Sequence, residues 1–302
     1  MLIAPASAHG ARTLTSHRVA DSARWLGAID ARTAAYATRA TGGAAVLRTD
    51  VGQVSVVPSP AGCDVTAAGA GRIVSMCGDW YALPGSGSPP LASDVAVTDA
   101  AGGNTVRVRQ TIPSTSEAPP GGPTAVGAEW ILTAWNVHSD SWTNIYTNWH
   151  TGETREGEPL DPRHPDDLDA PGLAGELCSP LRATVVPADQ PAYGFRMLPV
   201  TQRGAWVVIV RAQDDSSRLH GRHASLYRCG SAKAIKLPAG FHPDALGDGW
   251  AADSLDGTLL RLADRRVFRV SAPRGVMHLT HGRAYVADPA VGELRTVLLP
   301  RR

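Results

Sequence analysis

Acidic and imidazole side chains are the groups in this chain whose types and spacing could support chemistry. A glycosidase needs two carboxylates facing each other across a sugar, about 5 to 9.5 Å apart. The candidate acids are Asp30, Asp140, Asp166, Asp167, Asp169, Asp253 and Asp256. Two His-x-x-His pairs also occur, His220 with His223 and His278 with His281. On a strand, an offset of three residues places two side chains on opposite faces, so neither pair predicts a metal site.

Motifs of nucleophilic and phosphate chemistry are absent from the sequence. No Gly-x-Ser-x-Gly elbow occurs, and the Gly-Gly pairs at 42–43 and 102–103 lack the strand-to-helix context of a phosphate loop. Residues 253–258 resemble the Asp-box turn of sialidases but are one residue short and lack its aromatic residue, which favours a plain hairpin turn. We therefore expect no cofactor and no metal, and we favour a binding protein. An enzyme, either a glycoside hydrolase or a lyase with carboxylates from separate sheets, is the alternative.

An aromatic stretch from Glu129 to Glu153 holds four of the eight tryptophans. Because successive residues of a strand point to opposite faces, this stretch divides into two sets. One face is expected to pack between sheets and carries Ile131, Trp135, Val137, Ile145 and Trp149. The other presents flat rings beside hydrogen-bonding groups, which suit a sugar or peptide ligand; the predicted ligand-binding residues are Trp142, Asn144, Tyr146 and Asn148, with His138 and Asp140 of the adjoining loop. The alternative is a row that only shields its own sheet.

The four cysteines include no Cys-x-x-Cys pair, which favours disulfides over zinc. Four cysteines allow three pairings, and we expect Cys63 with Cys77 and Cys178 with Cys229. Closing the shorter loop adds about 3 kcal/mol in the chain-entropy model. Paired cysteines indicate an oxidising compartment and predict a secreted or cell-surface protein. Four free thiols in a cytosolic protein are the alternative.

The N-terminus and the composition add to this expectation. Ala6-Ser7-Ala8 has the small-x-small form of a signal-peptidase site, so residues 1–15 are expected to be a flexible tail or the remnant of an export signal. Net charge is +1 with both signs interspersed, which argues against nucleic-acid binding. No apolar run approaches the about 18 residues of a membrane span. The preference for arginine over lysine is typical of a GC-rich genome, such as an actinobacterial one.

The sequence predicts that short β-strands position these residues. Pro and Gly punctuate β-branched runs, and no long segment has the apolar period of a helix. A repeat is visible in which a small residue and a spacer precede a short apolar strand, with anchors at Trp25, Ile73, Trp130, Trp206, Trp250 and Ala284. Hairpins such as NIYTNWHTGE follow the anchors. Six units at spacings of about 34 to 76 residues suit a β-propeller.

With these hairpins, residues 20–300 resemble the six- or seven-bladed propellers of the TolB/YncE/WD40-like group, although no Trp-Asp dipeptide recurs. We expect an all-β fold with one β-propeller domain over residues 16–302 and six blades; five or seven blades and a pair of β-sandwiches stay open. Residues 113–123 and 155–180 are expected to be long exposed loops. The expected function is a binding module for a glycan or a partner protein. A scaffold subunit of a larger secreted assembly, docking proteins through both loops, is a further alternative.

Peptide mapping without reduction tests the cysteine pairing. We expect one linked peptide pair joining Cys63 to Cys77 and a second joining Cys178 to Cys229, with no alkylation of the unreduced protein. Alkylation of four thiols in the native protein would count against both the disulfides and export.

Overall fold

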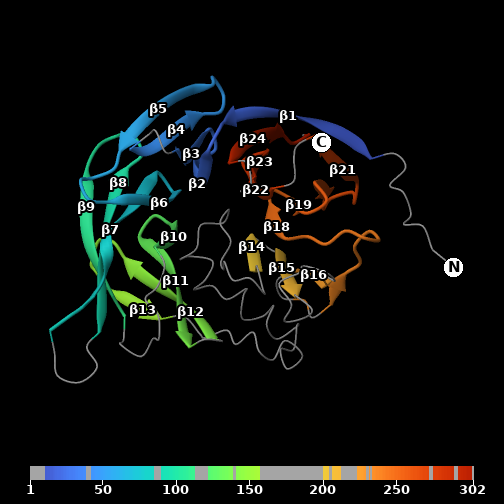
Figure 1. The fold of residues 1–302 in the computed structure, drawn as a ribbon. Helices are drawn as coiled ribbons and strands as arrows, with labels where there is room; N and C mark the ends of the chain where they lie inside the picture. Colours follow the sequence, from blue (N-terminus) through green and yellow to red (C-terminus); the bar gives the residue numbers. More distant parts are fainter. Residues whose placement is uncertain are drawn as a thin grey trace. The chain divides into compact units, whose positions relative to one another are not determined.

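The computed structural model is an all-β protein (Figure 1). It describes residues 11–38, 42–84, 90–112, 122–138, 141–156, 200–203, 206–211, 223–228, 231, 233–271, 275–288 and 292–300. Within these ranges the regular secondary structure consists of β-strands, as the β-branched runs predict. The described residues form two compact units, one from residues 23–156 and one from residues 11–22 with 200–300. A single domain over 16–302 stays a prediction.

The unit of residues 23–156 contains three four-stranded antiparallel sheets, each a meander of consecutive strands. The first is β2 (Ala23–Asp30), β3 (Thr33–Thr38), β4 (Gly43–Arg48) and β5 (Gln53–Pro58). The second is β6 (Asp64–Gly69), β7 (Arg72–Ala82), β8 (Leu91–Asp99) and β9 (Thr105–Ile112). The third is β10 (Pro123–Val126), β11 (Trp130–His138), β12 (Ser141–Asn148) and β13 (Thr154–Glu156). Sheets of this size and topology fit the blades of a propeller.

The second unit contains a four-stranded and an eight-stranded sheet among its described residues. The smaller sheet is β14 (Val200–Arg203), β15 (Trp206–Arg211), β16 (His223–Arg228) and β17 (Ala234–Ile235). The larger sheet includes β18 (Ala245–Gly247), β19 (Trp250–Asp253), β20 (Thr258–Arg261) and β21 (Val267–Ser271). It also includes β22 (Val276–Thr280), β23 (Arg283–Asp288), β24 (Glu293–Leu298) and β1 (Arg12–Ala20).

The first described strand, β1, joins the two halves of the eight-stranded sheet (Figure 1). Arg12 to Thr15 pair in parallel with Phe268 to Ser271 of β21. The rest of β1 pairs antiparallel with β24, beginning with Ser16 opposite Val297. Residues 12–15, which the sequence predicts to belong to a tail, are therefore the first half of a strand whose partners lie about 255 residues away. Partners at that separation leave no local signal.

Tight turns with left-handed residues join the first strand to the second. Three of these turns have positive φ at two consecutive residues, 47° and 77° at Ala70-Gly71, 51° and 78° at Asp248-Gly249, and 50° and 73° at His281-Gly282. Such turns match the right-handed twist of the strands that they connect. They explain the glycine that precedes the anchors Ile73, Trp250 and Ala284.

One hydrogen bond recurs between two turns of the same sheet. The N–H that follows the third strand donates to the C=O of the turn between the first and second strands. The pairs are Thr49 with Arg32 (2.7 Å), Ala100 with Gly71 (3.0 Å), Trp149 with Glu129 (2.9 Å), Leu262 with Gly249 (2.8 Å) and Leu299 with Gly282 (2.9 Å). The repeat of the sequence is therefore a repeat of backbone geometry.

The tryptophan anchors occupy this geometry with one exception. Trp130, Trp206 and Trp250 each begin the second strand of their sheet. Trp25 instead lies on β2, the first strand of its sheet, where the second strand begins at Thr33. The prediction that Trp25 is equivalent to the others is wrong, because the same motif occurs here on the first strand of the sheet instead of the second.

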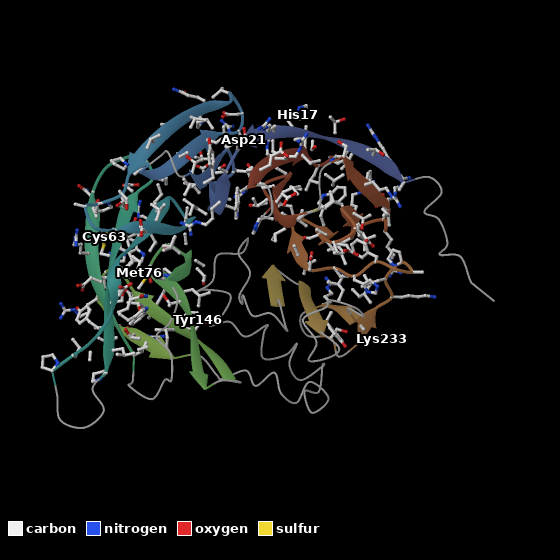
Figure 2. All side chains as sticks on the ribbon, in the orientation of Figure 1. His17, Asp21, Cys63, Met76, Tyr146 and Lys233 are labelled. Carbon is white, nitrogen blue, oxygen red and sulfur yellow. A yellow bond between two sulfur atoms is a disulfide. The ribbon has the colours of Figure 1, made fainter. Side chains whose placement is uncertain are left out.

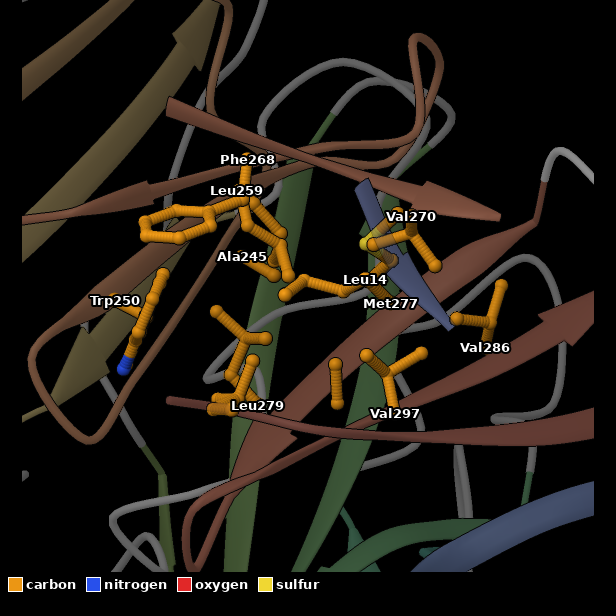
Figure 3. Packing of buried hydrophobic residues seen from close by; sticks show 13 residues of the cluster. Leu14, Ala245, Trp250, Leu259, Phe268, Val270, Met277, Leu279, Val286 and Val297 are labelled. Carbon is orange, nitrogen blue, oxygen red and sulfur yellow. The ribbon is translucent and has the colours of Figure 1, made fainter. Parts of the chain in front are cut away.

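Apolar side chains fill the space between neighbouring strands and sheets within each unit. In the second unit a cluster of buried residues extends from Leu14 of β1 to Trp250 and Val297 (Figure 3). In the first unit, Val46 and Val57 of one sheet pack with Ile73 of the next. Sheets covered in this way have nearly continuous apolar strands rather than strict alternation.

A disulfide fastens the first hairpin of the second sheet. Cys63 and Cys77 are bonded, one position beyond the pair formed by Asp64 and Met76, and Figure 2 labels Cys63 and Met76 at this end of the hairpin. The predicted 63–77 pairing is confirmed. Cys178 and Cys229 lie outside the described residues.

Gly247 of β18 provides a test of how closely two strands approach. A Cβ at this position would lie 1.9 Å from the carbonyl oxygen of Leu279 on β22. Because that neighbour is backbone, we expect Gly247→Ala to lower the free energy of unfolding by about 3 kcal/mol or to prevent folding. The matched control is Gly103→Ala, whose nearest neighbour is Asp99 Cβ at 3.6 Å, with a change within about 0.5 kcal/mol. Equal urea midpoints for the two variants would contradict the packing.

Candidate functional site

The β11–β12 hairpin carries the predicted ligand-binding row. Along its register, Trp142 lies opposite Asn136, Asn144 opposite Ala134, and Tyr146 opposite Leu132. Asn148 lies opposite Trp130 at the other end of the hairpin. Since a strand rises about 3.3 Å per residue, the row from Trp142 to Asn148 extends over about 20 Å. His138, opposite Ser141, is at the end that adjoins Trp142.

The opposite face of this hairpin is packed, as the alternation predicts. Ile131 and Trp149 are buried with four valines of the second sheet, Val74, Val95, Val97 and Val108. Ile145 packs with Ile112 at the end of β9. The predicted packing of Ile131, Ile145 and Trp149 is therefore confirmed, whereas the side chains of Trp135 and Val137 lie outside the described residues.

A buried polar bridge joins the same two sheets. Gln110, Thr133 and Thr147 are each fully buried. The Gln110 amide Nε2 donates to Thr133 Oγ1 at 3.1 Å and lies 3.2 Å from Thr147 Oγ1. A satisfied amide in an apolar interface fixes the register of the strands that it joins. Sequence reasoning missed this bridge, because a lone Gln and two Thr on separate strands carry no shared pattern.

Tyr146 is the described member of the row that stands out. Its side chain is only 6% exposed, and its hydroxyl has no hydrogen-bond partner among the described residues. Figure 2 labels Tyr146, which belongs to β12. Leu132, its partner in the register, is also buried. Both faces of the hairpin are thus covered at its middle, and buried tyrosine hydroxyls ordinarily find a partner.

Asn148, at the far end of the row, stabilises the turn that follows β12. Its Oδ1 accepts the backbone N–H of His150 at 3.0 Å and of Thr151 at 3.1 Å. Gly152, with φ of 76°, completes this turn by donating to the Asn148 carbonyl at 2.8 Å. Asparagine commonly stabilises turns in this way. The side chains of His138, Trp142 and Asn144, and Asp140 as a whole, lie outside the described residues.

The acids near residue 253 form a structural network. Asp253, 1% exposed, accepts the backbone N–H of His242 at 2.9 Å and of Asp256 at 3.2 Å. Asp244 accepts both the N–H and the hydroxyl of Ser254, whose Oγ accepts the N–H of Met277. Burial raises the pKa of Asp253, partly countered by these hydrogen bonds. The predicted hairpin-turn role of residues 253–258 is confirmed.

The remaining candidate groups do not converge among the described residues. Asp30 accepts the N–H of Arg32 and shapes a turn, while Asp166, Asp167, Asp169 and His220 lie outside the described ranges. His278 lies on β22 and His281 in the turn that follows it. In the part of the chain that the structure describes, no three His, Cys, Asp or Glu residues are grouped as a metal site, and no helix is present that could cross a membrane.

Comparison with known proteins finds similarity in fold alone. No protein-family model matches the chain, and no curated protein matches its sequence. The β-propeller domain of Cps50 (Swd1) from Myceliophteria thermophila is 8% identical, with TM-score 0.38 over 94% of this chain and 98% of that one. The acylaminoacyl peptidase of Pyrococcus horikoshii is 9% identical, with TM-score 0.39 over 88% of this chain and 41% of that one. The Dos1 propeller is 11% identical, with TM-score 0.30 over 97% and 76%. At these scores the similarities carry no argument about function.

His278 gives the unit of β22 a defined pH dependence. Burial disfavours the charged imidazolium and lowers the pKa of His278 to about 4, from 6.5. The neutral ring therefore contributes stability above pH 6.5 that is lost as pH falls towards 4. At about 1.4 kcal/mol per pKa unit, we expect the free energy of unfolding of the native chain to fall by about 2–3 kcal/mol more than that of His278→Gln between pH 7 and pH 4.

Urea denaturation at several pH values measures this difference. Protonation of Asp253, whose pKa burial raises, acts in the opposite direction but is common to both proteins, so it cancels in the comparison. Parallel stability profiles for the native chain and His278→Gln would contradict the assignment.

Proposed function

We propose that the chain is an exported, six-bladed β-propeller that binds a glycan beside β12. The blade count is supported by the number of four-stranded groups. Four separate sheets have four strands each, and the eight-stranded sheet divides at β1 into β18–β21 and a group of β22, β23, β24 and β1. The recurring hydrogen bond between turns, found in five of the six groups, supports treating these groups as copies of one repeat.

The observation that carries the ligand proposal is the buried, unpartnered hydroxyl of Tyr146. Leaving such a group without a hydrogen bond costs about 1–3 kcal/mol, and a sugar hydroxyl that bonded it would remove this cost. Rings and amides side by side suit a sugar, whose apolar face stacks and whose hydroxyls bond. The proposed contacts are Trp142, Asn144 and Tyr146, with His138 and Asp140 at the adjoining end of the hairpin. Asn148 remains in the proposed row but acts through its turn, where its Oδ1 is engaged.

Export is supported by the cysteine chemistry. The Cys63–Cys77 disulfide belongs to an oxidising compartment, because cytosolic thiols are kept reduced. A secreted or cell-surface location would also place a glycan-binding protein beside its ligand. The predicted 178–229 pair would add a second covalent tie.

Removal of a single hydroxyl tests the ligand proposal. We expect Trp142→Ala to abolish binding to the glycans that the native chain selects on an array. We expect Tyr146→Phe to weaken it about tenfold or more, since the relieved cost of about 1–3 kcal/mol is no longer available to binding. The matched control is Tyr81→Phe, whose hydroxyl bonds Asp94 on another sheet. We expect its affinity to be unchanged.

The same variant reports the contrary case. Tyr146→Phe removes an unsatisfied buried group, so the free energy of unfolding of the ligand-free chain rises in either case. If no ligand reaches Tyr146, glycan binding stays as it was. That result, or a native chain that retains no glycan, would overturn the proposal.

A further inference from the structure

The strand β5 ends its sheet and leaves one edge open. In the order β2-β3-β4-β5 it is the last strand (Figure 1), so the described residues pair with it on the β4 side alone. Open edges present unpaired backbone groups that can receive another strand. The residues of β5 that present these groups are those in the non-hydrogen-bonded pairs with β4, because their N–H and C=O groups point away from β4.

The ladder places Val54 and Val56 at the open edge. Ser59 donates its N–H to the Gly42 carbonyl at 3.2 Å, which marks this rung as hydrogen-bonded. Because bonded and non-bonded rungs alternate in an antiparallel pair, the next bonded rungs are Ala44–Val57, Val46–Ser55 and Arg48–Gln53. The N–H and C=O groups of Val54 and Val56 therefore point away from β4. Pro58, the next such position, has no N–H and ends the available edge.

The side chains at this edge are apolar and exposed. Val51 is 64%, Val54 47% and Val56 53% exposed, and no charged residue occurs from Val51 to Cys63. The last strands of the two following sheets differ in this respect, because β9 carries exposed Arg107 and Arg109 and β13 carries exposed Arg155. Charges of that kind normally guard an edge against pairing. The β5 edge lacks them.

We propose that β5 pairs antiparallel with β5 of a second copy of this chain. A two-fold axis at Ser55 places Val54 opposite Val56 of the partner subunit, and both pairs have their backbone groups directed outward, so four hydrogen bonds form across the interface. The Val-Ser-Val segment reads the same in both directions, which an isologous contact requires. The absence of charge removes the like-charge repulsion that self-pairing would otherwise meet. Pro58 stays outside the paired positions.

Sedimentation of the full chain tests this dimer. The contact is small, so we expect a monomer at about 1 µM and a rise towards twice the monomer mass at several hundred micromolar. Val54→Lys and Val56→Lys are expected to keep the chain monomeric throughout, because each places two like charges at the axis. The matched control is Val106→Lys, which changes an exposed valine (40%) on the last strand of another sheet. It is expected to dimerise like the native chain.

A cross-link tests the register itself. Ser55 would face Ser55 of the partner subunit in a non-bonded rung, where the Cα atoms are about 4.5 Å apart and within reach of a disulfide. We expect Ser55→Cys to form a covalent dimer on oxidation. Gln53→Cys, which is equally exposed on the same strand face, would face position 57 instead and should not cross-link.

Three results would overturn the proposal: a monomer at every concentration, dimerisation that persists in Val54→Lys and Val56→Lys, or cross-linking of Gln53→Cys as efficient as that of Ser55→Cys. Circular dichroism of each variant ensures that these results report pairing rather than folding. The outcome is independent of glycan binding at β12.

Discussion

The hydrogen bond between two turns of the same sheet is the constraint on which the rest of the structure depends. It ties the residue after the third strand to the turn between the first two, as in Ala100 with Gly71 and Leu299 with Gly282. In three of the five turns the accepting glycine lies in the left-handed region, which favours Gly at Gly71, Gly249 and Gly282. Arg32 and Glu129 accept the same bond without a positive φ, so the bond itself, rather than one residue type, marks where the second strand begins.

Packing on both faces follows from repeating such a sheet. In the β11–β12 hairpin, one face meets the valines of the preceding sheet, yet Leu132 and Tyr146 on the other face are buried as well. In a strand of this kind the alternation of polar and apolar residues does not tell which face is buried, because both faces are covered. Polar groups that fall inside must then be satisfied individually, as Gln110 is by two threonines. The Tyr146 hydroxyl is one of five buried side-chain atoms among the described residues that lack such a partner.

Local patterns in the sequence were sufficient for the strands, the hairpins and the 63–77 disulfide, because these involve neighbours in the chain. The turn role of Asp253 was predictable for the same reason. Three features were not predictable locally: the pairing of β1 with β21, the bridge at Gln110 and the burial of Tyr146. Each depends on partners in other strands or sheets, and a residue such as Gln110 has the same local context whether buried or exposed. The equivalence of Trp25 failed because one motif can occur on either of two adjacent strands.

The place of β1 in the eight-stranded sheet has a consequence for how the protein is made. Among the described strands β1 is synthesised first, whereas its partners in β21 and β24 follow about 255 residues later. Until β21 and β24 have been synthesised, β1 has neither of its partner strands. A chain that stops before β24 therefore cannot complete the eight-stranded sheet, because β1 would lack one of its two partners.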